Sequence, residues 1–132
     1  MGERPRILLV DDELHLVESL KAGLEAKGYE VFIALDGKAA LEMARREIPD
    51  LVLLDLTLPT LDGYAVLKSL KEDEPCCHIP VLVITARTNS KDLVTTLENG
   101  ADSYYVKPLK FDTLLALMQT LLANKAKRQP AV

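Results

Sequence analysis

Strand-like and helix-like patterns of apolar residues alternate along the chain. Short runs rich in valine, isoleucine and leucine are typical of strands covered on both faces, and they lie at residues 6–10, 29–34, 51–54 and 80–85. A fifth strand is predicted at 102–106, where two tyrosines and a valine favour a strand. Between these runs, and after the last one, apolar residues recur every three or four positions, which indicates amphipathic helices. The pattern therefore predicts strands that are each followed by a helix.

Residues at the predicted helix ends support this alternation. Side chains able to cap a helix N-terminus precede three of the helices, at Asp36, Asp62 and Asn89 or Ser90. Gly28 and Gly100 follow the last apolar residue of two helices, where glycine commonly ends a helix. The last helix is expected over about 111–124.

Alternating strands and helices define the expected fold class. Parallel neighbouring strands need long crossover connections, so this order predicts an α/β fold, a doubly wound five-stranded parallel sheet with five helices on its two faces. A chain of 132 residues suits one domain. We expect the domain to occupy residues 1–124, with 125–132 as a basic tail or the start of a linker.

Composition and charge exclude several classes of protein. The chain is 48% hydrophobic and 27% charged with a formal net charge of −4, which argues against disorder and against nucleic-acid binding through bulk charge. The sequence contains neither a membrane-spanning apolar segment nor the pattern of a secretory leader, so we expect a cytoplasmic protein with no membrane partner.

Two adjacent cysteines, Cys76 and Cys77, lie beside His78 in a segment with the composition of a surface loop. Neighbouring cysteines rarely form a disulfide. A metal site built from these three residues lacks the separated second ligand pair of zinc sites, so reduced loop thiols are the favoured interpretation.

Reactive or charged side chains gather at the ends of the strand-like runs. They are Asp11 and Asp12 after the first run, Asp55 after the third, Thr85 at the end of the fourth and Lys107 after the fifth. In a doubly wound sheet the carboxyl ends of the strands share one edge, and ligands bind there. We therefore expect these side chains to lie together at one site.

The chemistry of this set indicates a metal ion and a phosphoryl group. Clustered carboxylates repel one another unless a cation lies among them, and hard oxygen ligands suit Mg²⁺. A lysine and a hydroxyl suit the oxygens of a phosphoryl group. The sequence has no glycine-rich phosphate loop and no Ser-His-Asp set, so Asp55 is the best-placed nucleophile. The alternative is that these groups are helix caps and solvated loop charges.

These residues resemble the receiver domain of two-component response regulators. The resemblance rests on DDE at 11–13, DLTLPTLDG at 55–63, TA at 85–86 and KP at 107–108, and it covers about residues 5–124. It implies the flavodoxin-like strand order 2-1-3-4-5. It also implies a signalling phosphoacceptor, which catalyses its own phosphoryl transfer and slow autodephosphorylation, and not an enzyme acting on a separate substrate.

The resemblance assigns a role to each residue of the acidic cluster. Asp55 accepts the phosphoryl group from a phosphohistidine of a sensor histidine kinase or a phosphotransfer protein. Asp12, Asp55 and the backbone carbonyl of Thr57 ligate Mg²⁺, with Mn²⁺ as a substitute, and Asp11 reaches the metal mainly through water.

A conformational switch is implied as well. Lys107 pairs with the phosphoryl oxygens, and Thr85 moves to hydrogen-bond one of them. Tyr104, three residues before the lysine, is the coupled aromatic, whereas Tyr105 points to the other face of its strand. Core packing is the alternative role for Tyr104, because an aromatic residue packs well on a strand. The Lys107–Pro108 bond is expected to be cis, as it often is in this family.

Two further positions tune the lifetime of the phosphoryl group in this family. They are Thr57 and Arg87 here, and a cation at 87 without an amide at 57 predicts slower self-hydrolysis than an Asn/Glu pair would give. The chain departs mildly from the family pattern at Thr60 and Leu109, where glycine and phenylalanine are usual.

The resemblance also implies an output surface, formed by the fourth helix, the fifth strand and the fifth helix. An effector or a second copy of the chain is expected to bind there. The fifth helix has an apolar stripe wider than one packing face needs, and its edge residues Leu117 and Leu121 are candidates for this contact, although ordinary burial explains most of the stripe.

Two rival classes of protein share part of this pattern. A phosphatase of the haloacid dehalogenase type also uses an aspartate nucleophile with Mg²⁺, but its second acid lies two residues later, where this chain has Thr57. The other rival is a binding module that keeps the receiver fold without accepting a phosphoryl group. The intact set of reactive residues argues against this second alternative.

Overall fold

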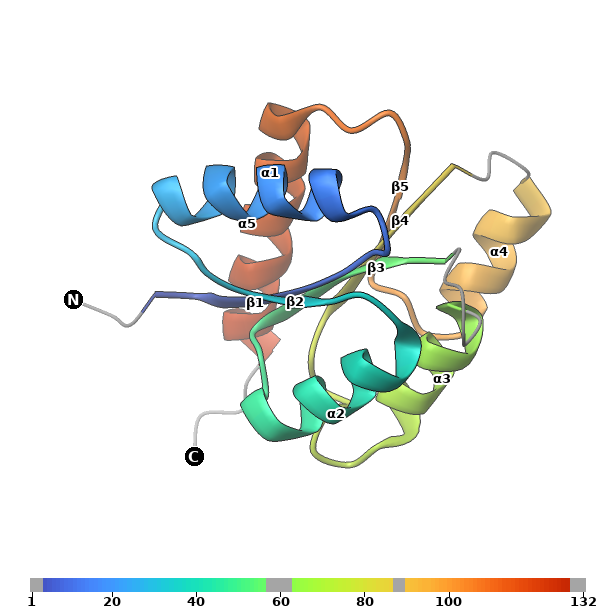
Figure 1. Cartoon of the computed structure of the whole chain (residues 1–132). Helices are drawn as coiled ribbons and strands as arrows, with labels where there is room; N and C mark the ends of the chain where they lie inside the picture. Colours follow the sequence, from blue (N-terminus) through green and yellow to red (C-terminus); the bar gives the residue numbers. More distant parts are fainter. Residues whose placement is uncertain (1–3, 57–62, 87–89, 129–132) are drawn as a thin grey trace.

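The computed structural model describes residues 4–56, 63–86 and 90–128, in which strands and helices alternate (Figure 1). The elements in chain order are β1 (Arg6–Val10), α1 (Leu14–Ala26), β2 (Glu30–Ala34), α2 (Gly37–Glu47), β3 (Leu51–Asp55), α3 (Gly63–Glu72), β4 (Val81–Thr85), α4 (Ser90–Glu98), β5 (Ser103–Val106) and α5 (Phe111–Arg128).

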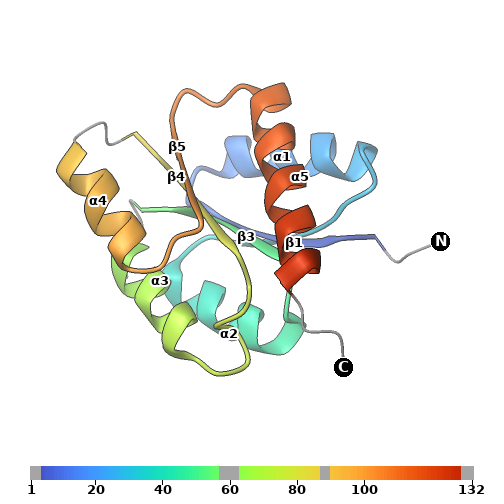
Figure 2. The ribbon, with the colours of Figure 1, turned by 180° about the vertical axis from the view of Figure 1, so that it is seen from behind.

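The strands form one parallel sheet in the order β2-β1-β3-β4-β5, which confirms the expected fold class and strand order. Helices α1 and α5 cover one face, and α2, α3 and α4 lie on the other (Figures 1 and 2). The chain therefore crosses from one face to the other between α1 and α2, through β2, and back again between α4 and α5, through β5, as a doubly wound sheet requires.

Two apolar cores flank the sheet because successive strand residues point to opposite faces. Ile7, Leu9 and Leu53 belong to the core beneath α1 and α5. Leu8 and Leu54 belong to the core beneath α2 and α3. Burial of one such leucine stabilises the fold by roughly 1.5–3 kcal/mol. These buried central strands fix the edge at which the reactive side chains emerge.

Most of the described helix ends follow the expected chemistry. The Asp36 side chain accepts a hydrogen bond of 2.8 Å from the backbone N–H of Ala39 and caps α2. Gly28 and Gly100 follow α1 and α4 with positive φ values of 96° and 101°, a conformation that glycine adopts without a steric penalty. The caps expected at Asp62 and Asn89 lie outside the described residues.

Helix α5 is longer than the sequence pattern predicts. It was expected to end near Asn124, but it continues to Arg128. Lysine, alanine and arginine are good helix formers, so the basic segment after Asn124 extends the helix without adding to its apolar stripe. Leu121 at the edge of that stripe is only 7% exposed and packs in the core beneath α1 and α5, as Leu117 does in part. Leu121 is therefore a core residue.

The apolar residues of α4 face outward. Leu93, Val94 and Leu97 are 36%, 52% and 47% exposed, whereas Thr96 on the opposite side is fully buried. The Thr96 hydroxyl lies 3.3 Å from that of Tyr64 on α3. Helical spacing identifies an apolar face but does not show what covers that face. In the described part of this chain, no other element covers the apolar face of α4.

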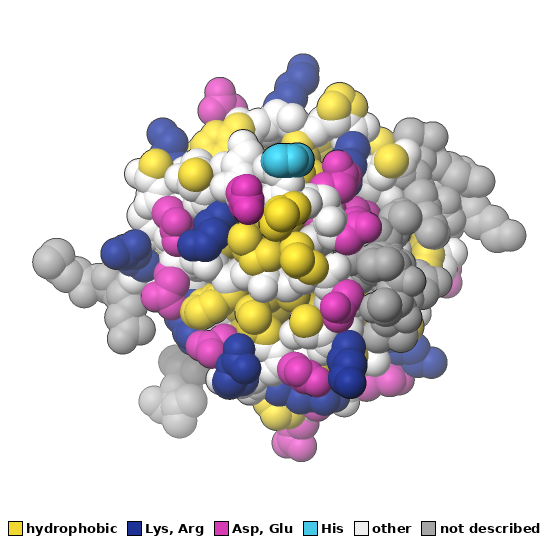
Figure 3. Space-filling model, in the orientation of Figure 1, with side chains coloured by type: hydrophobic (Ala, Val, Ile, Leu, Met, Phe, Trp, Pro, Cys, Tyr) yellow, Lys and Arg dark blue, Asp and Glu magenta, His cyan; other side chains and the backbone are white. Residues whose placement is uncertain are grey.

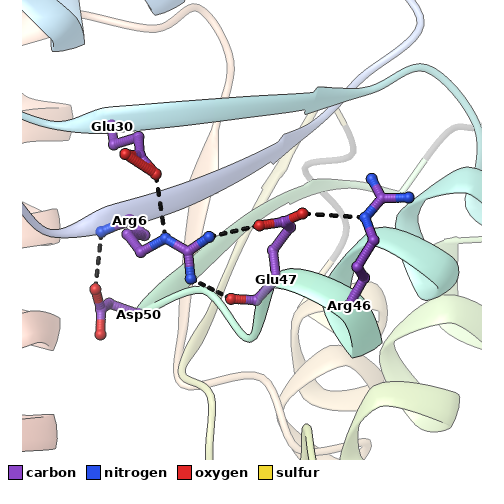
Figure 4. A network of polar contacts seen from close by, with 5 residues as sticks. All are labelled: Arg6, Glu30, Arg46, Glu47 and Asp50. Carbon is purple, nitrogen blue, oxygen red and sulfur yellow. Dashed lines mark hydrogen bonds and ion pairs between the residues drawn. The ribbon is translucent and has the colours of Figure 1, made fainter.

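The network around Arg6 fastens the end of the sheet opposite the reactive edge (Figure 4). The Arg6 guanidinium contacts Glu30 Oε1 at 3.2 Å and Glu47 Oε1 at 2.6 Å, and it also donates to the backbone carbonyl of Glu47. The Arg6 backbone N–H donates to Asp50 at 2.8 Å. These contacts join the starts of β1, β2 and β3 to the end of α2.

Ile48 ends α2 in the left-handed backbone conformation, with φ 44° and ψ 66°. This conformation costs a residue with a Cβ atom about 1–2 kcal/mol, and glycine avoids most of that cost. We expect Ile48→Gly to raise the free energy of unfolding by about 0.5–1 kcal/mol, after allowing for the greater entropy of glycine in the unfolded chain. Urea denaturation measures this change. The β-branched control Ile48→Val should give no gain, and a glycine variant less stable than this control would contradict the expectation.

Candidate functional site

An acidic cluster lies at the carboxyl edge of the sheet. Asp11 directly follows β1 and Asp55 ends β3, and these two strands are neighbours in the sheet. Asp12 adds a third carboxylate, and one oxygen from each of the three lies within 4.8 Å of the others. Asp11 and Asp55 are only 4% and 5% exposed, while Asp12 faces solvent.

Lys107 reaches this cluster from the other side of the site. Its backbone N–H donates to the carbonyl of Thr85 at 2.7 Å, which fixes the start of the loop after β5. Its ammonium nitrogen lies 3.3 Å from Asp55 Oδ2, 3.5 Å from Asp11 Oδ2 and 3.2 Å from Glu13 Oε1. The structure therefore places one ammonium among several carboxylates.

The pKa shifts at the site reflect this excess of negative charge. Burial raises the pKa of Asp11, and the charge of Asp55 adds to the rise, whereas the hydrogen bond from the Glu13 N–H and the charge of Lys107 oppose it. Burial alone would lower the pKa of Lys107, but the charges of Asp11 and Asp55 and the hydrogen bonds to Glu13 and Asp55 outweigh it, so that pKa is raised. A single lysine leaves the site net negative.

The three carboxylates fit a hard divalent cation. They supply oxygen donors only, from two buried side chains and one exposed side chain, which leaves room for water ligands, as Mg²⁺ prefers. Burial raises the pKa of Asp11, so a cation beside this carboxylate would stabilise its charged form. Among the described residues this is the one group of three or more His, Cys, Asp or Glu side chains that comes together in this way.

The cysteine loop does not form such a group in the described structure. Cys76 is buried, and burial raises the pKa of its thiol to about 11. The Cys77 thiol donates to the backbone carbonyl of Glu74 at 3.3 Å. Both cysteines are free thiols. Cys76 lies in the core beneath α2 and α3 and is therefore not the surface-loop thiol that the sequence composition suggested, whereas Cys77 is partly exposed.

The residues expected to form the switch lie next to the acidic edge. Thr85 ends β4 and is fully buried, and Tyr104 packs against the core beneath α2 and α3. Tyr105 packs on the opposite face of the sheet, as the alternation along β5 predicted, and its hydroxyl accepts a hydrogen bond of 2.9 Å from the backbone N–H of Lys110. The Lys107–Pro108 bond is cis, as expected.

The structure also shows a contact that the sequence did not reveal. Glu13 was part of the DDE motif but had no assigned role, and here its side chain pairs with Lys107. Its position directly after the acidic pair was the one available signal. Thr57 and Arg87 lie outside the described residues, so their expected roles stay predictions.

Among the described residues no helix combines the length and apolarity needed to cross a bilayer.

The fold and the site together define a small doubly wound α/β domain whose carboxyl edge offers three carboxylates to a cation and one lysine to an anion.

Comparisons with known proteins agree with this class. Residues 7–119 match the family described as the response regulator receiver domain. The response regulator PleD of Caulobacter vibrioides is 44% identical over 120 residues, covering 91% of this chain and 26% of PleD. The transcriptional regulatory protein PrrA of Mycobacterium tuberculosis is 40% identical over 121 residues, covering 92% of this chain and 51% of PrrA. The crystal structure of a CheY-like receiver domain protein from Methanospirillum hungatei superposes with a TM-score of 0.90 at 31% identity, covering 96% of this chain and 99% of that chain.

The chain therefore belongs to the response regulator receiver domain family, a family of signalling domains in two-component systems. It spans about half of the length of PrrA and about a quarter of that of PleD.

Proposed function

We propose that the protein accepts a phosphoryl group on Asp55 in a Mg²⁺-dependent reaction and thereby switches its affinity for a partner. The donor is a phosphohistidine of a sensor kinase or a phosphotransfer protein. One observation carries this proposal: the buried Asp55 carboxylate lies 3.3 Å from the Lys107 ammonium and within 4.8 Å of the carboxylates of Asp11 and Asp12. A nucleophile, a set of metal ligands and a cation for phosphoryl oxygens are thus combined.

The proposed transfer gives each of these groups a role, and Asp55 has two, as nucleophile and as a metal ligand. An oxygen of Asp55 forms a bond to phosphorus while the phosphorus–nitrogen bond of the donor breaks, and the imidazole leaves with the electron pair and takes up a proton. Bound Mg²⁺ would neutralise charge on the donor and acceptor oxygens, held by Asp12, Asp55 and the Thr57 carbonyl, with Asp11 acting mainly through water. Lys107 stabilises the negative charge of the phosphoryl oxygens.

The haloacid dehalogenase alternative lacks an observation in its favour. That reaction needs a second acid two residues after the nucleophile, and this chain has Thr57 there. Residues 7–119 match the receiver domain family, which is a different class of protein. The remaining alternative to the proposed function is a module with the receiver fold that binds a partner without accepting a phosphoryl group. An experiment must distinguish these two functions.

Intact mass measured after incubation with a small acyl-phosphate donor and Mg²⁺ tests the proposal. The wild type should gain one phosphoryl group, and the gain should disappear with a chelator or in Asp55→Asn. Asp50→Asn is a matched control because Asp50 precedes the same strand at the opposite edge of the sheet, and it should still be labelled. A folded wild type that takes up no phosphoryl group would favour the phosphorylation-independent binding module.

The proposed switch couples Asp55 to β4 and β5. Thr85 lies at the end of the strand next to β3, and its carbonyl already binds the Lys107 N–H. In the proposal, the Thr85 hydroxyl moves to a phosphoryl oxygen and Tyr104 takes a new position with it. Phosphorylation would thus stabilise a second arrangement of the loop after β4 and of α4.

An output surface for this switch is available on α4. Leu93, Val94 and Leu97 form an exposed apolar face on the helix that follows Thr85. We propose that an effector or a second copy of the chain binds to the surface of α4, β5 and α5, with the three α4 residues at its centre. On the described part of the face in Figure 3, acidic and basic side chains are interspersed. The formal net charge is −4, so direct nucleic-acid binding is not proposed.

The lifetime of the phosphoryl group is expected to depend on position 87. By its resemblance to other receivers, a cation at Arg87 and no amide at Thr57 leave the attacking water poorly held. Arg87→Glu is therefore expected to shorten the half-life of the phosphorylated protein by about 2- to 10-fold. This effect is smaller than that of a full general acid–base group, because the glutamate would only help to hold the attacking water. Loss of the phosphoryl mass over time measures it, and an unchanged half-life would contradict the role of Arg87.

A further inference from the structure

Among the described residues, Glu13 is the one in contact with the Lys107 ammonium that has no part in the proposed transfer. Its Oε1 lies 3.2 Å from Lys107 Nζ, nearer than the Asp55 and Asp11 oxygens at 3.3 and 3.5 Å. An ammonium group has three N–H donors. The three carboxylates therefore occupy all of the donors of Lys107 in this structure.

The side chain of Glu13 contacts Lys107, although Glu13 stands at a position where a side chain can cap helix α1. Glu13 is the N-cap residue of α1, yet its carboxylate makes no capping hydrogen bond to that helix. Its backbone is held on both sides, because its N–H donates to Asp11 Oδ1 at 3.0 Å and its carbonyl accepts from Val17 at 3.0 Å. The backbone of Glu13 is thus fixed, and its carboxylate does not cap α1. The described interaction of this carboxylate is its contact with Lys107.

A phosphoryl oxygen that binds Lys107 must displace one of its three partners. Asp11 is almost fully buried, so loss of its contact would leave a charge without solvent, and Asp55 must keep its place as the nucleophile until it has bound the phosphorus. The Glu13 side chain is 62% exposed, and water can hydrate it as soon as it is released. Glu13 is therefore the partner that is given up most easily.

We propose that Glu13 is a positioning residue that holds Lys107 in the unphosphorylated state and competes with the phosphoryl group for it. This inference rests on the proposed function of Asp55 and Lys107. Because an exposed ion pair is weak, its removal is expected to speed labelling of Asp55 by about 2- to 5-fold. Glu13 would thus restrain phosphorylation without being needed for it.

Rates of labelling by a small acyl phosphate, followed by intact mass, test this with two substitutions at one position. Glu13→Gln removes the charge, and Glu13→Asp keeps the charge but shortens the side chain and favours capping of α1 instead. Both variants should be labelled faster than wild type, and Glu18→Gln, an exposed acid on the same helix, should not. The proposal is overturned if Glu13→Gln is not faster, or if it is faster while Glu13→Asp behaves as wild type, which would indicate a general charge effect.

A second measurement examines the contact without any phosphoryl transfer. The free energies of unfolding of Glu13→Gln, of Lys107→Met and of the double variant form a double-mutant cycle. Non-additive changes would show that Glu13 and Lys107 are coupled in the unphosphorylated protein, and additive changes would overturn the proposal. A wild type that takes up no label but shows this coupling would count against the proposed function and not against the contact.

Discussion

Replacing Gly63 with alanine is expected to lower the free energy of unfolding by about 1–3 kcal/mol, the usual cost of forcing extra volume into a packed site. A Cβ atom at Gly63 would lie 2.3 Å from Leu56 Cα and 2.6 Å from the Leu56 carbonyl oxygen. These are backbone atoms, which cannot rotate away as a side chain can. The Gly63 N–H also donates to the same carbonyl at 3.1 Å, so any shift that relieves the overlap strains this bond.

The disturbance caused by Gly63→Ala should reach the site, because Leu56 directly follows Asp55. Urea denaturation monitored by circular dichroism measures the stability. Gly23→Ala is the matched control, because its Cβ atom would also make a close contact, 2.9 Å from the ring of Phe111. That ring can move, and the higher helix propensity of alanine offsets the cost of moving it, so this variant should be close to wild type in stability. Near-wild-type stability of Gly63→Ala would show that the start of α3 can move away from Leu56 at little cost.

The second large effect is expected for Lys107→Met, which should slow labelling of Asp55 by about 100-fold or more at saturating Mg²⁺. Removal of one preorganised donor to a developing oxyanion commonly has an effect of this size. Lys107 is the cation that contacts both buried carboxylates, Asp55 at 3.3 Å and Asp11 at 3.5 Å. Without it, their mutual repulsion should also lower the stability of the metal-free protein, and Mg²⁺ should restore part of the loss.

Lys110→Met provides the control for Lys107→Met. Lys110 lies in the same loop, but its side chain is exposed, so its loss should leave the rate of labelling within about twofold of wild type, as surface substitutions usually do. A Lys107→Met rate within a few-fold of wild type, measured beside this control, would mean that another group stabilises the phosphoryl oxygens.

The sheet and the location of the site could be predicted from the sequence because one physical rule links them. The carboxyl ends of parallel strands share an edge, so Asp11 after β1, Asp55 at the end of β3 and Lys107 after β5 had to approach one another once the strand order was fixed. The apolar runs were long enough to define β1, β3 and β4 as buried strands.

Other features depend on tertiary contacts that the sequence pattern does not record. The apolar residues of α4 have regular helical spacing, yet Leu93, Val94 and Leu97 are exposed because spacing carries no information on what packs against a face. The contact between Glu13 and Lys107 joins residues that are far apart in the chain, and it depends on the direction of one flexible side chain. The end of α5 was missed because the basic residues after Asn124 lack the apolar stripe that marked the rest of the helix.

The most direct test of the central claim identifies the residue that carries the phosphoryl group. Borohydride reduces an aspartyl phosphate to homoserine, so reduction of the labelled wild type followed by peptide mass spectrometry reads out the position. We expect homoserine at position 55, and only after incubation with both the acyl-phosphate donor and Mg²⁺. Homoserine at another acidic position such as Asp11 or Asp12, or a phosphoryl adduct that yields no homoserine, would contradict the assignment of Asp55 as the phosphoacceptor.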